Sequence, residues 1–418
     1  MGGGLMQLVA YGAQDIYLTG NPQITFFKVV YRRHTNFSME SIEQTINGSV
    51  GSGSRVTSTI SRNGDLVYRL FYEVAGNLTC AAGAAGAANY YGNPGALVFD
   101  NVEVEVGGQR IDRQTGQWMH VWSSLTQKNE SRVLGSAGTH RQVSAGSSGT
   151  LFQELTAIGT AAATGADDAT VPGGGGGTEA LHIPFNAKVP LQFWFCRNPG
   201  LALPLIALQY HEVKIVTSFS SHMPATNTTK LWADYIYLDT DERRRFAQVS
   251  HEYLIEQVQF QAGSASGGST ELNFNHPVKE LVWTRGFDTV DASSNNDLYK
   301  GLHQDLADGD YQLKLNGHDR FSARPLNYFT KQQVYMHHTG PGDLGFTIGT
   351  TKVGASGDGI AVYSFALKPE EHQPSGTCNF SRIDNAQLTG PAEARDVFAV
   401  NYNVLRIMSG MGGLAYSN

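Results

Sequence analysis

The stretch that decides the fold is residues 102–111, Val102-Glu103-Val104-Glu105-Val106-Gly107-Gly108-Gln109-Arg110-Ile111. Apolar and charged residues alternate over its first half, which is the period of a strand with one buried face. The Gly-Gly pair that follows predicts a two-residue turn of type I′ or II′, after which the chain returns. The stretch therefore predicts an antiparallel β-hairpin.

The same pattern recurs along the chain. Residues 311–315 (YQLKL) alternate, Asn316-Gly317 supplies the turn, and residues 319–321 (DRF) return. Residues 65–74 alternate as well. Helix signals are scarce, although residues 239–248 (DTDERRRFAQ) predict a short helix with acids near its N-terminus. Many short strands of this kind indicate an all-β protein made of antiparallel sandwiches or barrels.

An internal repeat is suggested by the two hairpins. A shift of 210 positions places Gly107 on Gly317, and a second echo, with a shift of 192, places Ile215 on Ile407. The shifts differ by 18 residues, about the length of the Ala- and Gly-rich segment 157–178. These observations predict one β-domain repeated in tandem, with an extra loop in the first copy and a boundary between residues 219 and 252.

Composition excludes several classes of protein. Of the 418 residues 41% are hydrophobic, and 20 Phe, 18 Tyr and 5 Trp supply a large core, which excludes a disordered chain. Only 16% are charged and the net charge is −7. Lys and Arg cluster nowhere beyond residues 243–245, so binding along a nucleic-acid backbone is disfavoured.

Targeting and redox signals are also few. No apolar run approaches the ~18 residues of a membrane span, and the N-terminus lacks the pattern of a secretory signal. Cys80, Cys196 and Cys378 are odd in number and far apart, so they are expected to be buried thiols in a reducing compartment.

No motif for catalysis is found. The glycines at 173–177 lack the Lys-Ser/Thr of a phosphate-binding loop. His337 and His338, if on a strand, face opposite ways, and residues 370–372 (EEH) read as a turn between prolines. We therefore expect no catalytic residue, no cofactor and no metal site. Six Asn-x-Ser/Thr sequons occur, most of them expected to be chance, and Asn77, Asn129 and Asn227 are kept as candidate glycosylation sites.

Longer blocks of sequence resemble a known family, the major capsid proteins of nucleocytoplasmic large DNA viruses, most of all the phycodnavirus type with iridovirus-like relatives behind it. The blocks are residues 20–37 (GNPQITFFKVVYRRHTNF), the Gly107 hairpin, 193–208 (FWFCRNPGLALPLIAL), 316–321 (NGHDRF), 363–367 (YSFAL) and 373–382 (QPSGTCNFSR). They are spread over nearly the whole chain, so the resemblance is specific.

The resemblance implies two eight-stranded jelly rolls in tandem, in agreement with the inferred repeat. It implies a structural protein, not an enzyme, that forms homotrimers of nearly hexagonal outline and tiles the icosahedral shell of a large double-stranded DNA virus. Its partners would be neighbouring capsomers, and, through an N-terminal arm, minor capsid proteins and the inner membrane side, with no direct nucleic-acid contact. Its place would be the virion, assembled inside an infected eukaryotic cell.

On this basis we expect an N-terminal arm at residues 1–24, a first jelly roll at 25–218, a linker with a short helix at 219–250 and a second jelly roll at 251–418. Two alternatives stay open: a lectin-like jelly-roll protein that binds carbohydrate, and a minor capsid paralogue. A lectin should gather aromatic and acidic residues on one loop, whereas the acidic loops at 167–168 and 305–310 are thin in both.

Overall fold

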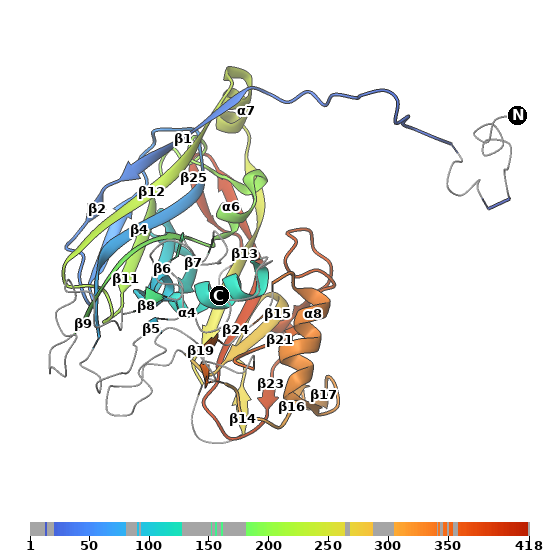
Figure 1. Cartoon of the computed structure of the whole chain (residues 1–418). Coiled ribbons are helices and arrows are strands. Elements are labelled where there is room, and N and C mark those ends of the chain that lie inside the picture. Colours follow the sequence, from blue (N-terminus) through green and yellow to red (C-terminus); the bar gives the residue numbers. More distant parts are fainter. Residues whose placement is uncertain are drawn as a thin grey trace, which may run out of the picture. The chain divides into compact units, whose positions relative to one another are not determined.

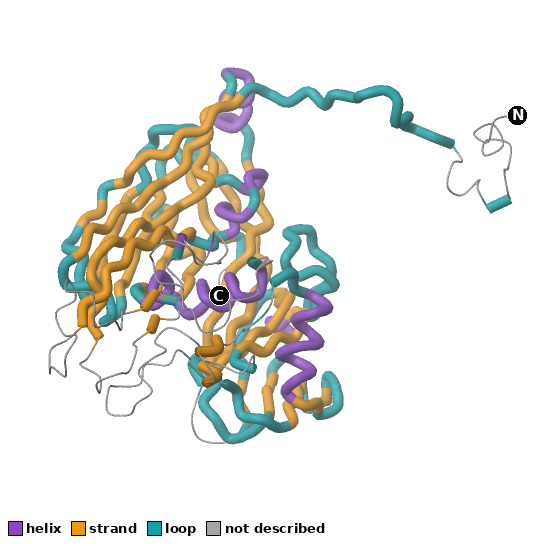
Figure 2. Tube along the Cα trace, viewed as in Figure 1, coloured by secondary structure: helices purple, strands orange, loops and turns teal. Residues whose placement is uncertain are grey.

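The computed structural model describes residues 13–14, 21–80, 90–91, 93–127, 152, 155–156, 160–161, 181–263, 268–286, 305–340, 342, 346–348, 351–353 and 358–416. The chain divides into two units, Met1–Asn36 and Phe37–Asn418. In the first unit, residues 21–36 form neither helix nor strand. The second unit is built mainly of strands (Figure 1, Figure 2).

Its first half is a sandwich of two antiparallel sheets, which we call the first roll. One sheet has the order β1-β12-β4 with β9 and β10 on the far side of β4: β1 (Phe37–Gln44), β12 (Asn227–Leu238), β4 (Leu66–Cys80), β9 (Leu181–Pro190) and β10 (Leu203–Pro204). The other has the order β2-β3-β11-β6-β7: β2 (Ile46–Asn47), β3 (Arg55–Thr59), β11 (Val213–Phe219), β6 (Phe99–Val106) and β7 (Gln109–Thr115).

The second half is a second sandwich, the second roll. One sheet has the order β13-β24-β15-β21, with β22 on β15 and β25 on β24: β13 (His251–Gln261), β24 (Asp396–Met408), β15 (Pro277–Thr284), β21 (Ile360–Ser364), β22 (Cys378–Asn379) and β25 (Met411–Leu414). The other has the order β14-β23-β16-β17, with β18 on β16: β14 (Ser269–Glu271), β23 (Ala386–Thr389), β16 (Asp310–Leu315), β17 (His318–Asp319) and β18 (Arg324–Pro325).

The two rolls share one topology. The eight principal strands are β1, β3, β4, β6, β7, β9, β11 and β12 in the first roll and β13, β14, β15, β16, β17, β21, β23 and β24 in the second. Numbered 1 to 8 along the chain, they form sheets of order 1-8-3-6 and 2-7-4-5 in both rolls. This is the arrangement of a jelly roll, in which sequential strands alternate between two packed sheets except for the hairpin of the fourth and fifth strands. The prediction of two tandem eight-stranded jelly rolls is therefore confirmed, as are the hairpins at Gly107 (β6–β7) and Asn316-Gly317 (β16–β17).

The second sequence echo is wrong. Ile215 lies in β11, the seventh strand of the first roll, whereas Ile407 lies in β24, the eighth strand of the second. The eighth strands end at Leu238 and Met408, 170 positions apart, so the first roll is longer by 40 residues rather than 18 between its hairpin and its last strand. The similarity between the segments at Ile215 and Ile407 does not identify equivalent strands, because any half-buried strand has the same alternation of apolar and polar residues. Most of segment 157–178 lies outside the described residues.

Helices are short and connect strands. They are α3 (Pro94–Leu97), α4 (Gly116–Thr126), α6 (Trp194–Arg197), α7 (Thr240–Gln248) and α8 (Gln333–His337), with the 3₁₀ turns η1 (Pro199–Leu201) and η4 (Phe380–Arg382) and the π-helical turn η3 (Tyr328–Gln332) that leads into α8. Two small hairpins complete the described elements: β5 (Tyr90–Tyr91) with β8 (Thr160–Ala161), and β19 (Phe346–Ile348) with β20 (Thr351–Val353).

The region expected to link the rolls contains a strand. β12 lies between β1 and β4, so residues 227–238 belong to a sheet of the first roll. The predicted helix follows it as α7, where the Asp239 side chain accepts a hydrogen bond from the Thr240 N–H and acids occupy the first turn. Phe246 of α7 packs on the outer side of the first roll's sheet, against Leu66, Tyr68, Ala202 and Ile236.

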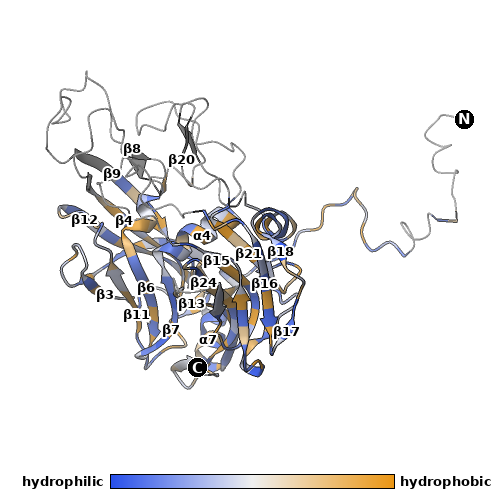
Figure 3. Ribbon diagram, turned by 90° about the horizontal axis from the view of Figure 1, so that it is seen from below, coloured by the Kyte–Doolittle hydropathy of each residue, from blue (hydrophilic) through white to orange (hydrophobic). Residues whose placement is uncertain are grey.

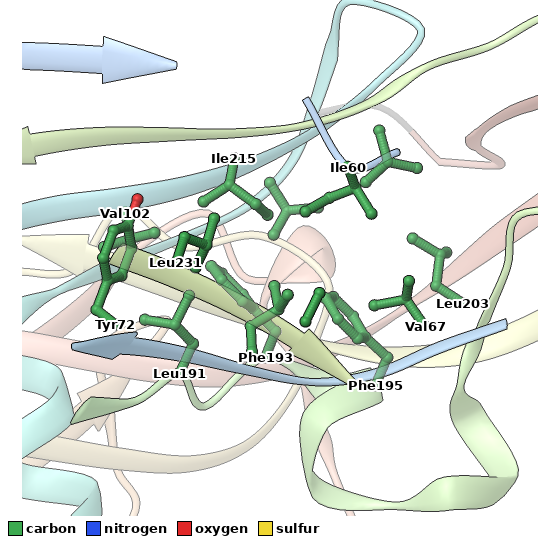
Figure 4. Close-up of a cluster of buried hydrophobic side chains, with 14 of the residues drawn as sticks. Ile60, Val67, Tyr72, Val102, Leu191, Phe193, Phe195, Leu203, Ile215 and Leu231 are labelled. Atoms are coloured by element: carbon green, nitrogen blue, oxygen red, sulfur yellow. The ribbon is translucent and has the colours of Figure 1, made fainter. Parts of the chain in front are cut away.

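Each roll has a core between its two sheets, and Ile255, Leu405 and Ile407 of β13 and β24 extend that of the first roll. Apolar and polar residues alternate along the strands (Figure 3), and the apolar ones meet between the two sheets. In the first roll they form a continuous buried cluster, part of which Figure 4 shows: Ile60, Val67, Tyr72, Val102, Leu191, Phe193, Phe195, Leu203, Ile215 and Leu231. In the second roll, Trp283, Tyr311 and Phe329 pack in tilted and edge-on arrangements at ring-centroid distances of 5.1–6.1 Å. Burying such side chains stabilises each by roughly 1.5–3 kcal/mol.

Candidate functional site: the junction between the rolls

The helix α4 joins the two rolls. It begins because the Thr115 side chain accepts a hydrogen bond from the Trp118 N–H at 3.1 Å, which satisfies one of its free amides. Gly116 is required there, since a Cβ atom would lie 2.2 Å from the carbonyl oxygen of Ala96. The helix therefore starts against its own roll and points its outer face at the other (Figure 1).

That outer face makes an apolar contact with the second roll. Trp118, Val121, Trp122 and Leu125 recur at helical spacing and are at most 4% exposed. They pack on the side of the β24–β15–β21 sheet that faces away from its own core, against Val282, Ile360, Val362, Phe398 and Val400. The Trp118 and Phe398 rings lie 5.3 Å apart. The two rolls are thus joined by a core of their own.

Beside this contact lies a buried ion cluster centred on Glu256 of β13. Its carboxylate is 2.8 Å from Arg197, which belongs to the first roll, and 2.8 Å from Lys279. His372 lies 3.7 Å away. Burial opposes ionisation of Glu256, but Arg197, His372 and Lys279 outweigh it and lower its pKa to about 2. Arg197 also covers the Trp122 ring at 4.6 Å, so the ionic and apolar contacts are continuous.

A second buried cluster surrounds His338, directly after α8. Its side chain is fully buried between Glu280, at 3.2 Å from Nε2, and Glu370, at 3.1 Å from Nδ1. Burial acts to lower the pKa of His338, but the two carboxylates prevail and raise it to about 9. The Thr339 N–H donates to Glu370 at 2.8 Å, and the Thr339 hydroxyl donates to the Thr126 carbonyl of α4 at 3.1 Å. This cluster therefore also connects the rolls.

Two sheet edges meet at the junction without forming a ladder. β7 of the first roll and β13 of the second lie side by side, and the Asp112 carboxylate accepts the Val258 N–H at 3.1 Å. Gln257 donates to the Ile111 carbonyl. Burial raises the pKa of Asp112 to about 6. Side chains thus satisfy edge groups that could otherwise pair with another chain.

Several sequence expectations are settled by these contacts. His337 and His338 do not lie on a strand, the case considered in the sequence analysis. His337 is the last residue of α8 and His338 follows it as the C-cap, because the turn η3 continues into a helix. Residues 370–372 form a turn as predicted, yet the contact of Glu370 with His338 was missed. Sequence offered no signal for it, since the partners are 32 residues apart. The Glu256 cluster was missed for the same reason.

The cysteines and possible metal ligands in the described part of the chain bear on the sequence expectations. Cys196 and Cys378 are free thiols, and burial raises the pKa of Cys196 to about 12, so it stays protonated at neutral pH. The described residues contain no cluster of three or more His, Cys, Asp or Glu that could hold a metal ion. Among them, no helix combines the length and apolar character needed to cross a membrane.

Two of the three candidate glycosylation residues lie in described strands of the first roll. Asn77 is in β4, opposite Pro184 of β9. Asn227 begins β12, where its amide donates to the Pro224 carbonyl at 2.8 Å and its oxygen accepts the Thr229 hydroxyl. Asn129 and the glycines at 173–177 lie outside the described residues.

The two joined jelly rolls define a class of protein, the double jelly-roll capsid proteins. A chain of the PBCV-1 virus capsid, 37% identical in sequence, superposes with a TM-score of 0.70 over 94% of this chain and 100% of that one. The major capsid protein of Faustovirus, only 14% identical, shares the fold with a TM-score of 0.58.

Family models and relatives identify the family. Residues 25–239 match the model "Major capsid protein N-terminus", and residues 242–413 match "Large eukaryotic DNA virus major capsid protein". The major capsid protein of Pyramimonas orientalis virus is 50% identical and that of Paramecium bursaria Chlorella virus 1 is 40% identical, both over the full length of both chains. The chain belongs to the major capsid proteins of large eukaryotic DNA viruses. It is a structural protein of the virion shell, where it assembles with other capsid subunits.

Proposed function

We propose that three copies of this chain associate into a capsomer of nearly hexagonal outline and that such capsomers tile an icosahedral shell. The observation that carries the proposal is the shared topology: both rolls have the strand order 1-8-3-6 and 2-7-4-5 and are packed within one unit. Three chains then supply six like modules, which a ring can place at near-sixfold positions. A hexagonal outline tiles a nearly flat facet, so one protein can cover a large shell.

The test is the mass of the purified full chain. Light scattering should give about three times 45.3 kDa, and electron microscopy of the particles should show hexagonal outlines. A permanent trimer of this kind buries on the order of 2,000–5,000 Å² at each interface, so the mass should not fall on dilution to nanomolar concentration. A monomeric mass would contradict the proposal, and glycan binding by that monomer would favour the lectin-like alternative.

The N-terminal arm is proposed to act separately, in contacts with minor capsid proteins and the inner membrane side of the shell. We extend the arm from the expected residues 1–24 to residues 1–36, because the first unit ends at Asn36 and β1 begins at Phe37. Residues 21–36 of this segment expose large apolar side chains at Ile24, Phe26, Phe27, Val29, Val30 and Tyr31. Exposed apolar side chains in such density favour a partner. Deletion of residues 2–18 should leave the trimer mass unchanged but impair assembly into shells. Loss of the trimer itself would contradict a separate role for the arm.

Domain limits and glycosylation complete the proposal. We place the first roll up to Leu238, since β12 pairs within it, the linker at residues 239–250 and the second roll from His251. Asn77, Asn129 and Asn227 remain candidate glycosylation sites. Mass spectrometry of peptides from virions should find added hexose on them, and unmodified peptides would exclude them.

A further inference from the structure

The helices α4 and α8 occupy equivalent positions in the two rolls. Each follows the hairpin between the fourth and fifth strands, with turn glycines Gly107 and Gly317. Met119 in α4 and Phe329 at the start of the η3–α8 helix, also 210 positions apart, both enter the core of their own roll. A shift of 210 therefore relates the two helices residue by residue.

The face that α4 buries is exposed on its counterpart. Trp118, Val121, Trp122 and Leu125 are at most 4% exposed in the junction. The residues 210 positions later keep the same helical spacing but face outward: Tyr328 is half-buried, Lys331, Gln332 and Tyr335 are exposed, and so is the adjoining Met336. Tyr335 is 88% exposed and Met336 is 56% exposed. We call these five residues the α8 face.

The surface that receives α4 also has a counterpart. In the second roll, α4 lies on the third, sixth and eighth strands, on the side away from the core, at residues such as Val282 and Phe398. In the first roll that side of β4 and β12 carries Phe71, Glu73, Lys230 and Trp232, all only partly buried, alternating with the core residues of the same strands. We call these four residues the first-roll face.

The first-roll face is already organised. The Trp232 indole N–H donates to Glu73 at 3.1 Å, and the Lys230 ammonium lies 5.8 Å from the centre of the Trp232 ring. Phe71 lies beside Trp232 in the register of β4 and β12. An ordered aromatic surface flanked by charged groups is typical of the centre of an interface.

We propose that the α8 face of one subunit docks on the first-roll face of the next subunit in the trimer. The proposal rests on the proposed trimer and names its contact. A second copy of this chain is the occupant because the chain already contains one such junction, between α4 and the second roll. Repeating it between chains gives six like junctions around a ring, three within chains and three between them.

The chemistry of the two faces agrees with a contact between chains. Lys331 is the cation of the α8 face and pairs with Asp358 of its own chain at 3.4 Å. The first-roll face carries both the carboxylate Glu73 and the cation Lys230, so the pair of opposite charge that the two faces offer is Lys331 with Glu73. Both faces mix aromatic with polar groups, whereas α4 presents only Trp, Val and Leu. A surface that stays in water until subunits meet needs such polar groups, but a junction formed as the chain folds does not.

The contact is heterologous, since each subunit gives one face and receives on the other. This gives a sharp experiment with two full-length variants. Tyr335→Glu spoils only the α8 face, and Trp232→Glu spoils only the first-roll face. For each variant alone, the mass measured by light scattering should be about 45.3 kDa, one third of the trimer mass. In an equimolar mixture of the two variants the mass should be about twice 45.3 kDa. The intact α8 face of the Trp232→Glu chain can dock on the intact first-roll face of the Tyr335→Glu chain, but the remaining faces are both changed, so the ring cannot close.

Controls separate the outcomes. Tyr210→Glu, at a tyrosine that is 76% exposed elsewhere, should remain trimeric. Lys230→Glu repeats the first-roll test at a partly exposed side chain and breaks its ion pair with Glu43, and circular dichroism checks the fold of every variant. A trimeric wild type whose folded Tyr335→Glu or Lys230→Glu variant stays trimeric overturns this docking and not the trimer. A mixture that stays monomeric overturns the pairing of the two faces. A monomeric wild type overturns the proposed function itself.

Discussion

The helices α4 and α8 stand at the same place in two rolls of the same topology, yet the outer face of α4 is buried and that of the η3–α8 helix is exposed. On its inner side, Val334 of α8 packs in the same cluster as α4. α4 presents two tryptophans, a valine and a leucine to the second roll, and all are buried. At the equivalent positions the helix of the second roll presents Tyr328, Lys331, Gln332 and Tyr335. The difference shows that a duplicated module keeps its fold while its outer faces adapt to what each must meet.

The junction beneath α4 differs from the α8 face in charge as well. The carboxylate of Glu256 lies 2.8 Å from both Arg197 and Lys279, and the side chains of Glu256 and Lys279 are buried. Such a cluster is costly to build and more costly to break, because removing one member leaves the others charged and unpaired. Three measurements test the difference between the covered junction and the exposed α8 face.

The largest effect is expected from Glu256→Gln. The change leaves Arg197 and the fully buried Lys279 without their counter-charge, so the free energy of unfolding should fall by about 3–5 kcal/mol. Urea unfolding followed by fluorescence measures it. The matched control is Glu252→Gln, in the same strand as Glu256. It breaks an exposed ion pair with Arg406 of β24 and should lower the free energy of unfolding by less than about 1 kcal/mol. Equal losses in the two variants would show that the cluster does not hold the junction.

A smaller effect is expected from Leu125→Ala, which opens a cavity between the rolls and should cost about 2–5 kcal/mol. Its counterpart 210 positions later, Tyr335→Ala, should change the unfolding free energy of the dissociated subunit by about 0.5 kcal/mol or less. Both are measured by urea unfolding in the Lys230→Glu background, whose subunits are expected to be monomeric. If Tyr335→Ala is as costly as Leu125→Ala, the two helix faces are not different in kind.

The smallest effect is a dependence of stability on pH. The folded pKa of His338, about 9, lies above its ordinary value of about 6.5. The charged cluster therefore stabilises fully below about pH 6.5, and this contribution is lost as pH rises toward 9. We expect a loss on the order of 1–3 kcal/mol, read from unfolding curves between pH 6 and 9. His338→Gln should flatten the dependence in this window, and an unchanged slope would exclude His338 as its source.

Much of the fold could be predicted because it depends on local signals. The Gly107 and Asn316-Gly317 hairpins, the helix at α7 and the repeat of 210 positions all follow from alternation, turn residues and caps close in sequence. The echo between Ile215 and Ile407 failed for the same reason: alternation reports that a segment is a strand and not which strand it is. The assignment needs the pairing partners, which come from distant parts of the chain.

The amino-acid sequence by itself determined that this protein is an all-β tandem repeat, because strand period and turn chemistry are properties of neighbouring residues. Only the tertiary structure decided that Glu256 meets Arg197, that His338 lies between Glu280 and Glu370, and that α4 is covered while its counterpart is open. The three ion pairs join residues 32 to 59 positions apart, and the residues that cover α4 lie farther still along the chain. No local pattern encodes them, since each depends on how two finished sheets pack against each other.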